Sequence, residues 1–239
     1  MLKATSPIMN SYHELSDSAS PPSYSDILKA EQKQIENSQK SKLRIIVLLD
    51  ASGSMQGMKS EAIQAVNLFV KKQQESKTND EVVFDFFTFN SESRHLVVNK
   101  PLAEVNPIPE DQYTPEGSTS LYDTIGYVLD FYKNDHDVLL VVMTDGYDTS
   151  SKKYTGKTIK PLLDQRKISP FDWEPVWLGA DPTVTQIGTD LGVNASASVN
   201  FGMLREYSDQ VFSKAVSEYR HEKAAGNKKA IVLKGQTEP

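Results

Sequence analysis

Two unbroken apolar runs, at residues 45–49 and 138–143, constrain the fold of this chain more than any other feature of its sequence. They form the centres of the segments Leu43–Leu49 and Asp137–Met143, in which polar and apolar residues do not alternate. A short run of this kind is typical of a strand that is buried on both faces. Such strands occur in parallel sheets that helices cover on both sides, so we expect an α/β domain.

The rest of the chain alternates between strand and helix patterns. Strands are expected at Val82–Phe89, Phe171–Leu178 and Ala195–Phe201, with a short edge strand at 93–98. Helices are expected where apolar residues line one helical face, at 58–75, Leu121–Tyr132, 157–167, Pro182–Leu191 and Leu204–Ala225. A polar loop with prolines spans 101–119, and Ile231–Leu233 is either a small terminal strand or a contact of the tail. This order predicts a doubly wound, mostly parallel open sheet, Rossmann-like, with helices on both faces.

The N-terminal region differs in composition from the rest of the chain. Residues 1–42 are rich in Ser, Pro, Lys, Gln and Glu and poor in apolar residues. We therefore expect a flexible N-terminal arm at 1–42, with a short polar helix from Ile27 to about Gln39. The α/β domain follows at 43–226, and a C-terminal tail occupies 227–239.

The arm contains a P-P-x-Y tetrapeptide, Pro21-Pro22-Ser23-Tyr24. Such a segment favours the polyproline II conformation, which docks on the aromatic grooves of WW domains. Pro21, Pro22 and Tyr24 are therefore candidate partner-binding residues. A plain proline-containing linker is the alternative.

Composition excludes several classes of function. The net charge of −6 disfavours nucleic-acid binding through phosphate neutralisation. The absence of cysteine excludes disulfides, thiolate zinc sites and thiol nucleophiles, and the four histidines form no metal-ligand pattern. No apolar run approaches the roughly 20 residues of a membrane span, and residues 1–12 contain no apolar run of a signal peptide. We expect a cytoplasmic protein with no membrane span.

Oxygen-bearing side chains follow both apolar runs. Asp50-Ala51-Ser52-Gly53-Ser54 comes directly after the first run, and Thr144-Asp145-Gly146 comes after the second. Gly117-Ser118-Thr119-Ser120 opens the helix expected at Leu121–Tyr132. Because the exit loops of parallel strands meet at one edge of a sheet, the three segments are expected to converge. Two carboxylates and three hydroxyls form a hard, oxygen-only ligand set, which suits Mg²⁺, with Mn²⁺ or Ca²⁺ as alternatives.

In this order and strand context, the chain from about Leu43 to Ala225 resembles a von Willebrand factor type A domain. Its metal-ion-dependent adhesion site is matched by Asp50, Ser52, Ser54, Thr119 and Asp145. The resemblance implies that the serines and the threonine bind the metal directly, that the aspartates act largely through water, and that an acidic residue of a partner takes the open position. Trp177-Leu178-Gly179-Ala180, a helix and then Gly192-Val193 loosely resemble compact bacterial, phage or large-DNA-virus members of the family.

These features predict a divalent-metal-dependent protein-binding module whose Mg²⁺-like cation accepts an Asp or Glu from a partner, and no enzyme. The alternative is a structural or assembly protein, such as a minor virion component, that uses the domain as a scaffold and the arm for contacts. A hydrolase built on Ser52 or Ser54 would need a histidine base, for which His95 is the one candidate. Thr155-Gly156-Lys157-Thr158 does not complete a phosphate-binding loop, because Ser151 stands where that motif needs glycine.

Overall fold

The computed structural model describes residues 41–180, 182–200, 208–228 and 230–233. The predicted arm at 1–42 lies almost entirely outside these residues, and so do Pro21, Pro22, Tyr24 and the helix expected from Ile27 to Gln39. None of the described helices combines the length and the hydrophobicity that crossing a bilayer requires.

A six-stranded sheet forms the centre of the domain, in the order β3-β2-β1-β4-β5-β6. Its strands are β1 (Ser41–Asp50), β2 (Asp80–Phe89), β3 (Ser93–Pro101), β4 (Val138–Thr144), β5 (Glu174–Gly179) and β6 (Ser198–Asn200). Only β3 runs antiparallel, at one edge, while the other neighbours pair in parallel. The chain winds outward in both directions from β1, so the strand order reverses between β1 and β4. This is the doubly wound, mostly parallel sheet that the sequence predicts.

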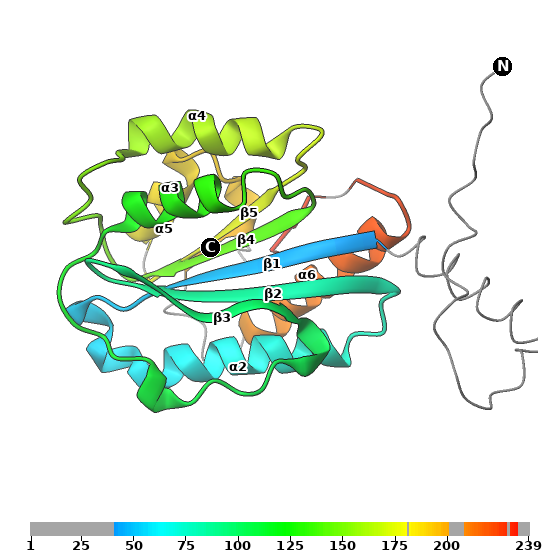
Figure 1. Cartoon of the computed structure of the whole chain (residues 1–239), viewed down its shortest axis with the longest axis horizontal. Helices are drawn as coiled ribbons and strands as arrows, with labels where there is room; N and C mark the ends of the chain where they lie inside the picture. The colour runs from blue at the N-terminus through cyan, green and yellow to red at the C-terminus, as the bar shows by residue number, and fades with distance from the viewer. Residues whose placement is uncertain (1–40, 181, 201–207, 229, 234–239) are drawn as a thin grey trace, which may run out of the picture. The chain divides into compact units, whose positions relative to one another are not determined.

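Helices cover both faces of the sheet (Figure 1). One face carries α2 (Lys59–Glu75) and α6 (Ser208–Ala224), which contact each other. The opposite face carries α3 (Leu121–Phe131), α4 (Gly156–Lys167) and α5 (Pro182–Asp190). The connections between the described elements contain short 3-10 helices at Gly53–Met58, Leu102–Glu104, Glu110–Gln112 and Ala195–Ala197.

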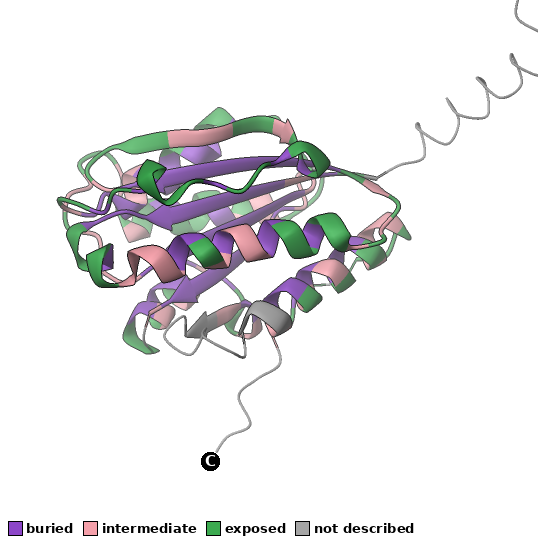
Figure 2. Ribbon diagram, turned by 90° about the horizontal axis from the view of Figure 1, so that it is seen from below, coloured by how far each residue is buried: buried purple, intermediate pink, exposed green. Residues whose placement is uncertain are grey.

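The core lies between the sheet and these two helical layers. All seven residues of β4 are buried, as are the last six of β1, because each strand has a helix above and below it (Figure 2). The buried positions of α2 recur every three or four residues, so one face of the helix packs on the sheet: Ala62, Ile63, Val66, Phe69, Val70 and Gln73. The two apolar runs of the sequence therefore form the centre of the core.

Three predicted segments differ from the structure. The strand expected at Phe171–Leu178 begins only at Glu174, because Asp172 has a left-handed φ of 52° that a strand excludes. The strand expected at Ala195–Phe201 opens as a 3-10 helix that the Asn194 side chain caps, so β6 begins at Ser198 and is described to Asn200, while Phe201 lies outside the described residues. The loop at 101–119 is less polar than predicted, because it buries four apolar or aromatic side chains: Leu102, Val105, Ile108 and Tyr113.

Residues 230–233, the described part of the tail after 228, contact the domain without forming a strand. Ile231 is buried, and its backbone N–H donates to Glu174 Oε1 at 3.2 Å. The Leu233 N–H donates to the Ser196 carbonyl at 2.7 Å. Of the two interpretations of Ile231–Leu233, the tail contact is the one that the structure has.

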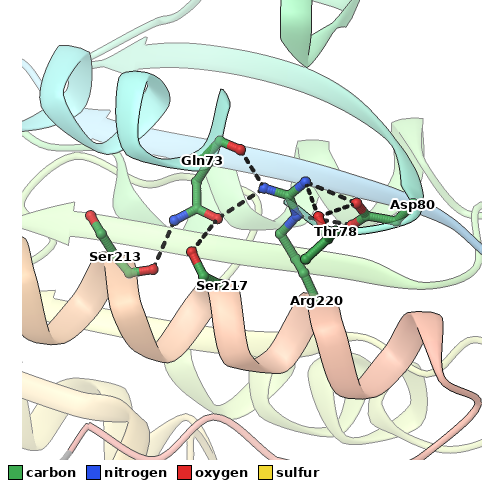
Figure 3. Close-up of polar contacts among 6 residues, drawn as sticks. All are labelled: Gln73, Thr78, Asp80, Ser213, Ser217 and Arg220. Carbon is green, nitrogen blue, oxygen red and sulfur yellow. Dashed lines mark hydrogen bonds and ion pairs between the residues drawn. The ribbon is translucent and has the colours of Figure 1, made fainter. Parts of the chain in front are cut away.

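A buried polar network fixes the C-terminal helix to the end of α2 and the start of β2 (Figure 3). The Arg220 guanidinium donates to both carboxylate oxygens of Asp80 at 2.9 Å. It also donates to Thr78 Oγ1 at 2.7 Å and to the Gln73 carbonyl at 2.7 Å. Gln73 Nε2 in turn donates to the Ser213 carbonyl at 2.9 Å. Arg220 thus neutralises a buried carboxylate and ties three elements together.

Candidate metal centre

The candidate metal centre lies where the strand order reverses. β1 and β4 pair up to Leu49 and Met143, so Asp50 and Thr144 end neighbouring strands at the same edge of the sheet. Asp145 follows directly after β4, and the Ser52–Ser54 segment follows directly after β1. In doubly wound sheets this crevice at the carboxyl ends of the strands is where ligands bind.

Asp50 is a fully buried carboxylate without a cationic partner among the described residues. Its Oδ1 accepts the Ser52 N–H at 2.7 Å, and its Oδ2 accepts the Thr144 hydroxyl at 2.6 Å. Burial raises the pKa of Asp50 although these hydrogen bonds oppose the change, and the negative charge of Asp145 raises it further. Burial therefore disfavours the ionised form of Asp50, which no positive charge among the described residues compensates.

A chain of hydrogen bonds links the two loops. Ser52 Oγ and Ser54 Oγ share a hydrogen bond of 3.1 Å, and Ser54 Oγ donates to Asp145 Oδ1 at 2.8 Å. Asp145 is half-buried, and this burial raises its pKa against the opposing hydrogen bond from Ser54. The structure thus brings Asp50, Ser52, Ser54 and Asp145 into one hydrogen-bonded group, although the first and last are 95 positions apart in the printed sequence.

Thr119 reaches the same edge on a third loop. The Gly53 N–H donates to the Gly117 carbonyl at 3.0 Å, so this loop packs directly on the Ser52–Ser54 segment. Gly117 has a φ of +72°, a left-handed conformation that favours glycine. Thr119 itself is buried, and its hydroxyl makes no hydrogen bond to the other four candidate side chains. Hydrogen bonds of its loop hold it beside them, from the Gly53 N–H to the Gly117 carbonyl and from the Thr119 N–H to Thr149 Oγ1.

The donor set fits a hard divalent cation. The described residues contain no group of three or more His, Cys, Asp and Glu side chains that could hold a metal. A cation at this edge would therefore rely on two carboxylates and several hydroxyls, which is the oxygen-only chemistry that Mg²⁺ and Mn²⁺ prefer. The buried charge of Asp50 is the observation that favours a positive ion here, because an uncompensated buried carboxylate is unfavourable.

Two residues contribute to the site in ways that the sequence did not reveal. Thr144 stands in the quoted Thr144-Asp145-Gly146 segment, but its hydrogen bond to Asp50 was not predicted. The buried Tyr113 hydroxyl donates to the Asp50 carbonyl at 2.5 Å from a loop 63 residues away in sequence.

The rival catalytic motifs have other roles. His95 packs against the Phe87 ring, with centroids 3.8 Å apart, and makes no hydrogen bond to Ser52 or Ser54. In Thr155-Gly156-Lys157-Thr158, the Thr155 N–H donates to Thr158 Oγ1 at 2.8 Å and the two threonines form a capping box at the start of α4. That segment therefore caps a helix and follows no strand directly.

Comparison with known proteins shows the fold. No protein-family model and no curated protein matches the sequence. Proximal thread matrix protein 1 from the mussel byssus aligns with 84% of this chain and 53% of its own, at a TM-score of 0.55 and 15% identity. The same protein with a zinc-occupied MIDAS motif aligns with 82% of this chain and 52% of its own, at a TM-score of 0.50 and 15% identity. A von Willebrand factor type A structure from Catenulispora acidiphila aligns with 77% of this chain and 42% of its own, at a TM-score of 0.47 and 13% identity.

The chain spans about half the length of the mussel protein that it matches. At such low identity these likenesses concern the fold alone. The chain has the Rossmann-like α/β fold of von Willebrand factor type A domains, as its sequence predicts. The looser resemblance to compact bacterial, phage or viral members stays a prediction.

Proposed function

We propose that this chain is a divalent-cation-dependent protein-binding module, in which a Mg²⁺-like ion accepts an Asp or Glu side chain from a partner. The ion would be held by Asp50, Ser52, Ser54, Thr119 and Asp145. The observation that carries the proposal is the buried Asp50 carboxylate, which has hydroxyl and N–H partners but no cationic one within the described ranges. It lies beside a hydrogen-bonded series of oxygens that ends on Asp145.

The chemistry of this ligand set favours binding over catalysis. Two carboxylates about balance the charge of one divalent ion, and the residues that the structure describes supply no third carboxylate to the group. A partner's carboxylate would complete the ligand shell of the ion, which acts as a Lewis acid when bound. His95 is packed among aromatic rings and not hydrogen-bonded to either serine, so this one candidate base does not activate a nucleophile here. The zinc-occupied MIDAS motif of the mussel protein supports a divalent ion in general and leaves the choice between Mg²⁺, Mn²⁺ and Ca²⁺ to measurement.

The experiment is a Mn²⁺ titration of the full chain by water proton relaxation, which detects an ion bound to protein. We compare the wild type with Asp145→Ala and with Asp111→Ala, which removes an exposed carboxylate from a neighbouring loop. The wild type and Asp111→Ala are expected to bind one ion, and Asp145→Ala none. Aspartate-containing peptides are then added, and their asparagine counterparts serve as the matched control. Equal binding by Asp145→Ala, or no binding by the wild type, refutes the proposal.

The P-P-x-Y segment motivates a second interaction. We propose Pro21, Pro22 and Tyr24 as a ligand for a WW-domain protein, and an assembly role, such as that of a minor virion component, as the alternative function of the whole chain. A purified WW domain titrated against the full chain and against Tyr24→Ala tests the first. Assembly that is unchanged by deletion of residues 1–40 argues against the second.

A further inference from the structure

Helix α3, which begins two residues after Thr119, is capped by residues from another loop. The first N–H groups of a helix have no partner within it, and the residue before the helix usually accepts one of them. Here Ser120 occupies that position but donates its hydroxyl to the Asn90 carbonyl at 2.6 Å. The Tyr122 N–H donates instead to Asp148 Oδ2 at 3.1 Å, and the Asp123 N–H to Ser151 Oγ at 2.9 Å. The loop after Asp145 therefore caps the helix that follows Thr119.

Thr119 is bound on both sides of its backbone by the same loop. Its N–H donates to Thr149 Oγ1 at 2.9 Å. Its carbonyl accepts the N–H of Thr149 at 2.8 Å and that of Ser150 at 3.0 Å. All the polar backbone groups of this candidate ligand are thus engaged by a segment that starts four residues after another candidate ligand, Asp145. The two candidate ligands belong to different loops, but hydrogen bonds connect these two loops directly.

Asp123, in the first turn of α3, accepts hydrogen bonds from the same loop that caps the helix. Its carboxylate accepts the N–H groups of Lys152, Lys153 and Tyr154 at 2.7, 2.9 and 2.7 Å. Burial alone would raise the pKa of Asp123, but these three hydrogen bonds outweigh it and lower the pKa. Asp148 also accepts the N–H of Ser151 at 3.2 Å, which holds the loop in its own turn. Hydrogen bonds therefore run in both directions between the start of α3 and residues 148–154.

We infer that Asp148 and Thr149 are positioning residues of the metal centre, which hold Thr119 in register with Asp145 before any ion binds. The inference rests on the proposed function, and it adds that the Thr119 and Asp145 loops form one preassembled unit. The mechanism is indirect: Thr149 fixes the backbone of Thr119, and Asp148 fixes the helix behind it. Partners that orient metal ligands in this way typically change metal affinity about ten- to hundredfold when they are removed.

Thr149 offers a matched pair of variants for the test. Thr149→Val keeps the shape of this exposed side chain but removes the oxygen that accepts the Thr119 N–H, whereas Thr149→Ser keeps that oxygen. Two measurements are made on the full chain: the Kd for Mn²⁺, and hydrogen–deuterium exchange of the Thr119 amide without metal. In Thr149→Val the Kd is expected to rise about tenfold and the amide to exchange faster, and Thr149→Ser restores both. Asp148→Ala, which frees the N–H of Tyr122, is expected to raise the Kd at least as much.

The two readouts separate the possible failures. A merely structural role would lower the melting temperature of Thr149→Val and leave its Mn²⁺ affinity equal to that of the wild type, which overturns the inference. An unchanged exchange rate of the Thr119 amide in Thr149→Val overturns the inference as well, because the hydrogen bond to Thr149 Oγ1 then does not restrain the Thr119 backbone. If the wild type binds no Mn²⁺ while the exchange rates respond as expected, the proposed function fails, and Asp148 and Thr149 hold the loop for another purpose.

Discussion

Replacing Asp50 by asparagine removes one buried charge and is expected to keep the hydrogen bonds around it. The asparagine oxygen can accept the Ser52 N–H as Asp50 Oδ1 does, at 2.7 Å. The new amide would face Thr144 Oγ1, which lies 2.6 Å from Asp50 Oδ2. The Thr144 hydroxyl can then turn its proton to the Gly146 carbonyl, 3.2 Å away, and accept from the amide. Asp50→Asn is therefore close to isosteric and fully hydrogen-bonded.

The metal-free protein should not lose stability through this change. Desolvation penalises an unpaired buried carboxylate by several kcal/mol, and hydrogen bonds to a charged group each return about 1.5–3 kcal/mol. Because burial raises the pKa of Asp50, the penalty exceeds the return in the metal-free state. We expect metal-free Asp50→Asn to unfold with a free energy between that of the wild type and about 2 kcal/mol above it.

The metal-loaded proteins should show the opposite order. Mg²⁺ at about 100 times its Kd stabilises a protein that binds it only when folded by about 2.7 kcal/mol. For a domain of this size, this corresponds to a rise in melting temperature of about 5–10 °C. Asp50→Asn is expected to show no rise, because a neutral amide replaces a charged ligand of the ion. Thermal unfolding followed by circular dichroism, with Mg²⁺ and with EDTA, measures all four states.

Two results would refute this reasoning. If Mg²⁺ raises the melting temperature of Asp50→Asn as much as that of the wild type, Asp50 is not part of the metal site. If metal-free Asp50→Asn is several kcal/mol less stable than the wild type, the buried charge is compensated by a partner other than an ion. Asp111→Ala is the control for a nonspecific effect of acidic residues, because its side chain is exposed.

Three further predictions concern the framework of the domain. Arg220→Met leaves the Asp80 carboxylate, whose side chain is 1% exposed, without its cation, and should lower the unfolding free energy in urea titration by about 3–5 kcal/mol. The double variant Arg220→Met/Asp80→Asn should recover part of this loss. If it recovers none, the ion pair does not have the role assigned to it. A Cβ at Gly188 would lie 2.4 Å from the Trp177 ring, so Gly188→Ala should cost about 1–3 kcal/mol, a result that an unchanged urea midpoint would refute. Because the pKa of Asp123 is lowered in the folded state, its carboxylate stabilises the protein above its unfolded pKa of about 3.9, and this stabilisation is lost in acid. The difference in unfolding free energy between the wild type and Asp123→Asn should therefore shrink between pH 6 and pH 3. A difference that stays constant over this range would contradict the prediction.

The layers of the fold could be predicted from the sequence because their signals are local. β4 is buried along its whole length, and an unbroken apolar run in the sequence predicts this burial without knowledge of distant contacts. The candidate ligands could be predicted for a related reason. A strand exit fixes where Asp50 and Asp145 emerge, so the order of the strands alone brings them to one edge.

Other features of the site arise from contacts between residues far apart in the chain. The hydrogen bond from Tyr113 to the Asp50 carbonyl spans 63 positions, and those that cap α3 span 26 and 28. Asp, Ser and Thr are common both in turns and as helix caps. Their presence at 148–151 therefore does not show whether they form a local turn or cap a helix elsewhere in the chain. The start of β5 was misplaced for a different reason: Trp173 has the strand-forming character that was expected, but Asp172 before it has a backbone conformation that no strand allows.

The division of labour within the site bears on how an ion would bind. Ordering a loop costs about 1–2 kcal/mol of free energy per residue. If binding of the ion had to order three loops, this cost would reduce the affinity of the site for the ion. Here hydrogen bonds within the protein already join the loops, through Gly53 to Gly117 and through Thr149 to Thr119. The unfavourable part of the metal-free site is then the burial of the Asp50 and Asp145 carboxylates, which a cation relieves directly. A preassembled site of this kind predicts that removing the metal lowers stability without unfolding the loops, so the Thr119 amide should stay protected from exchange in EDTA.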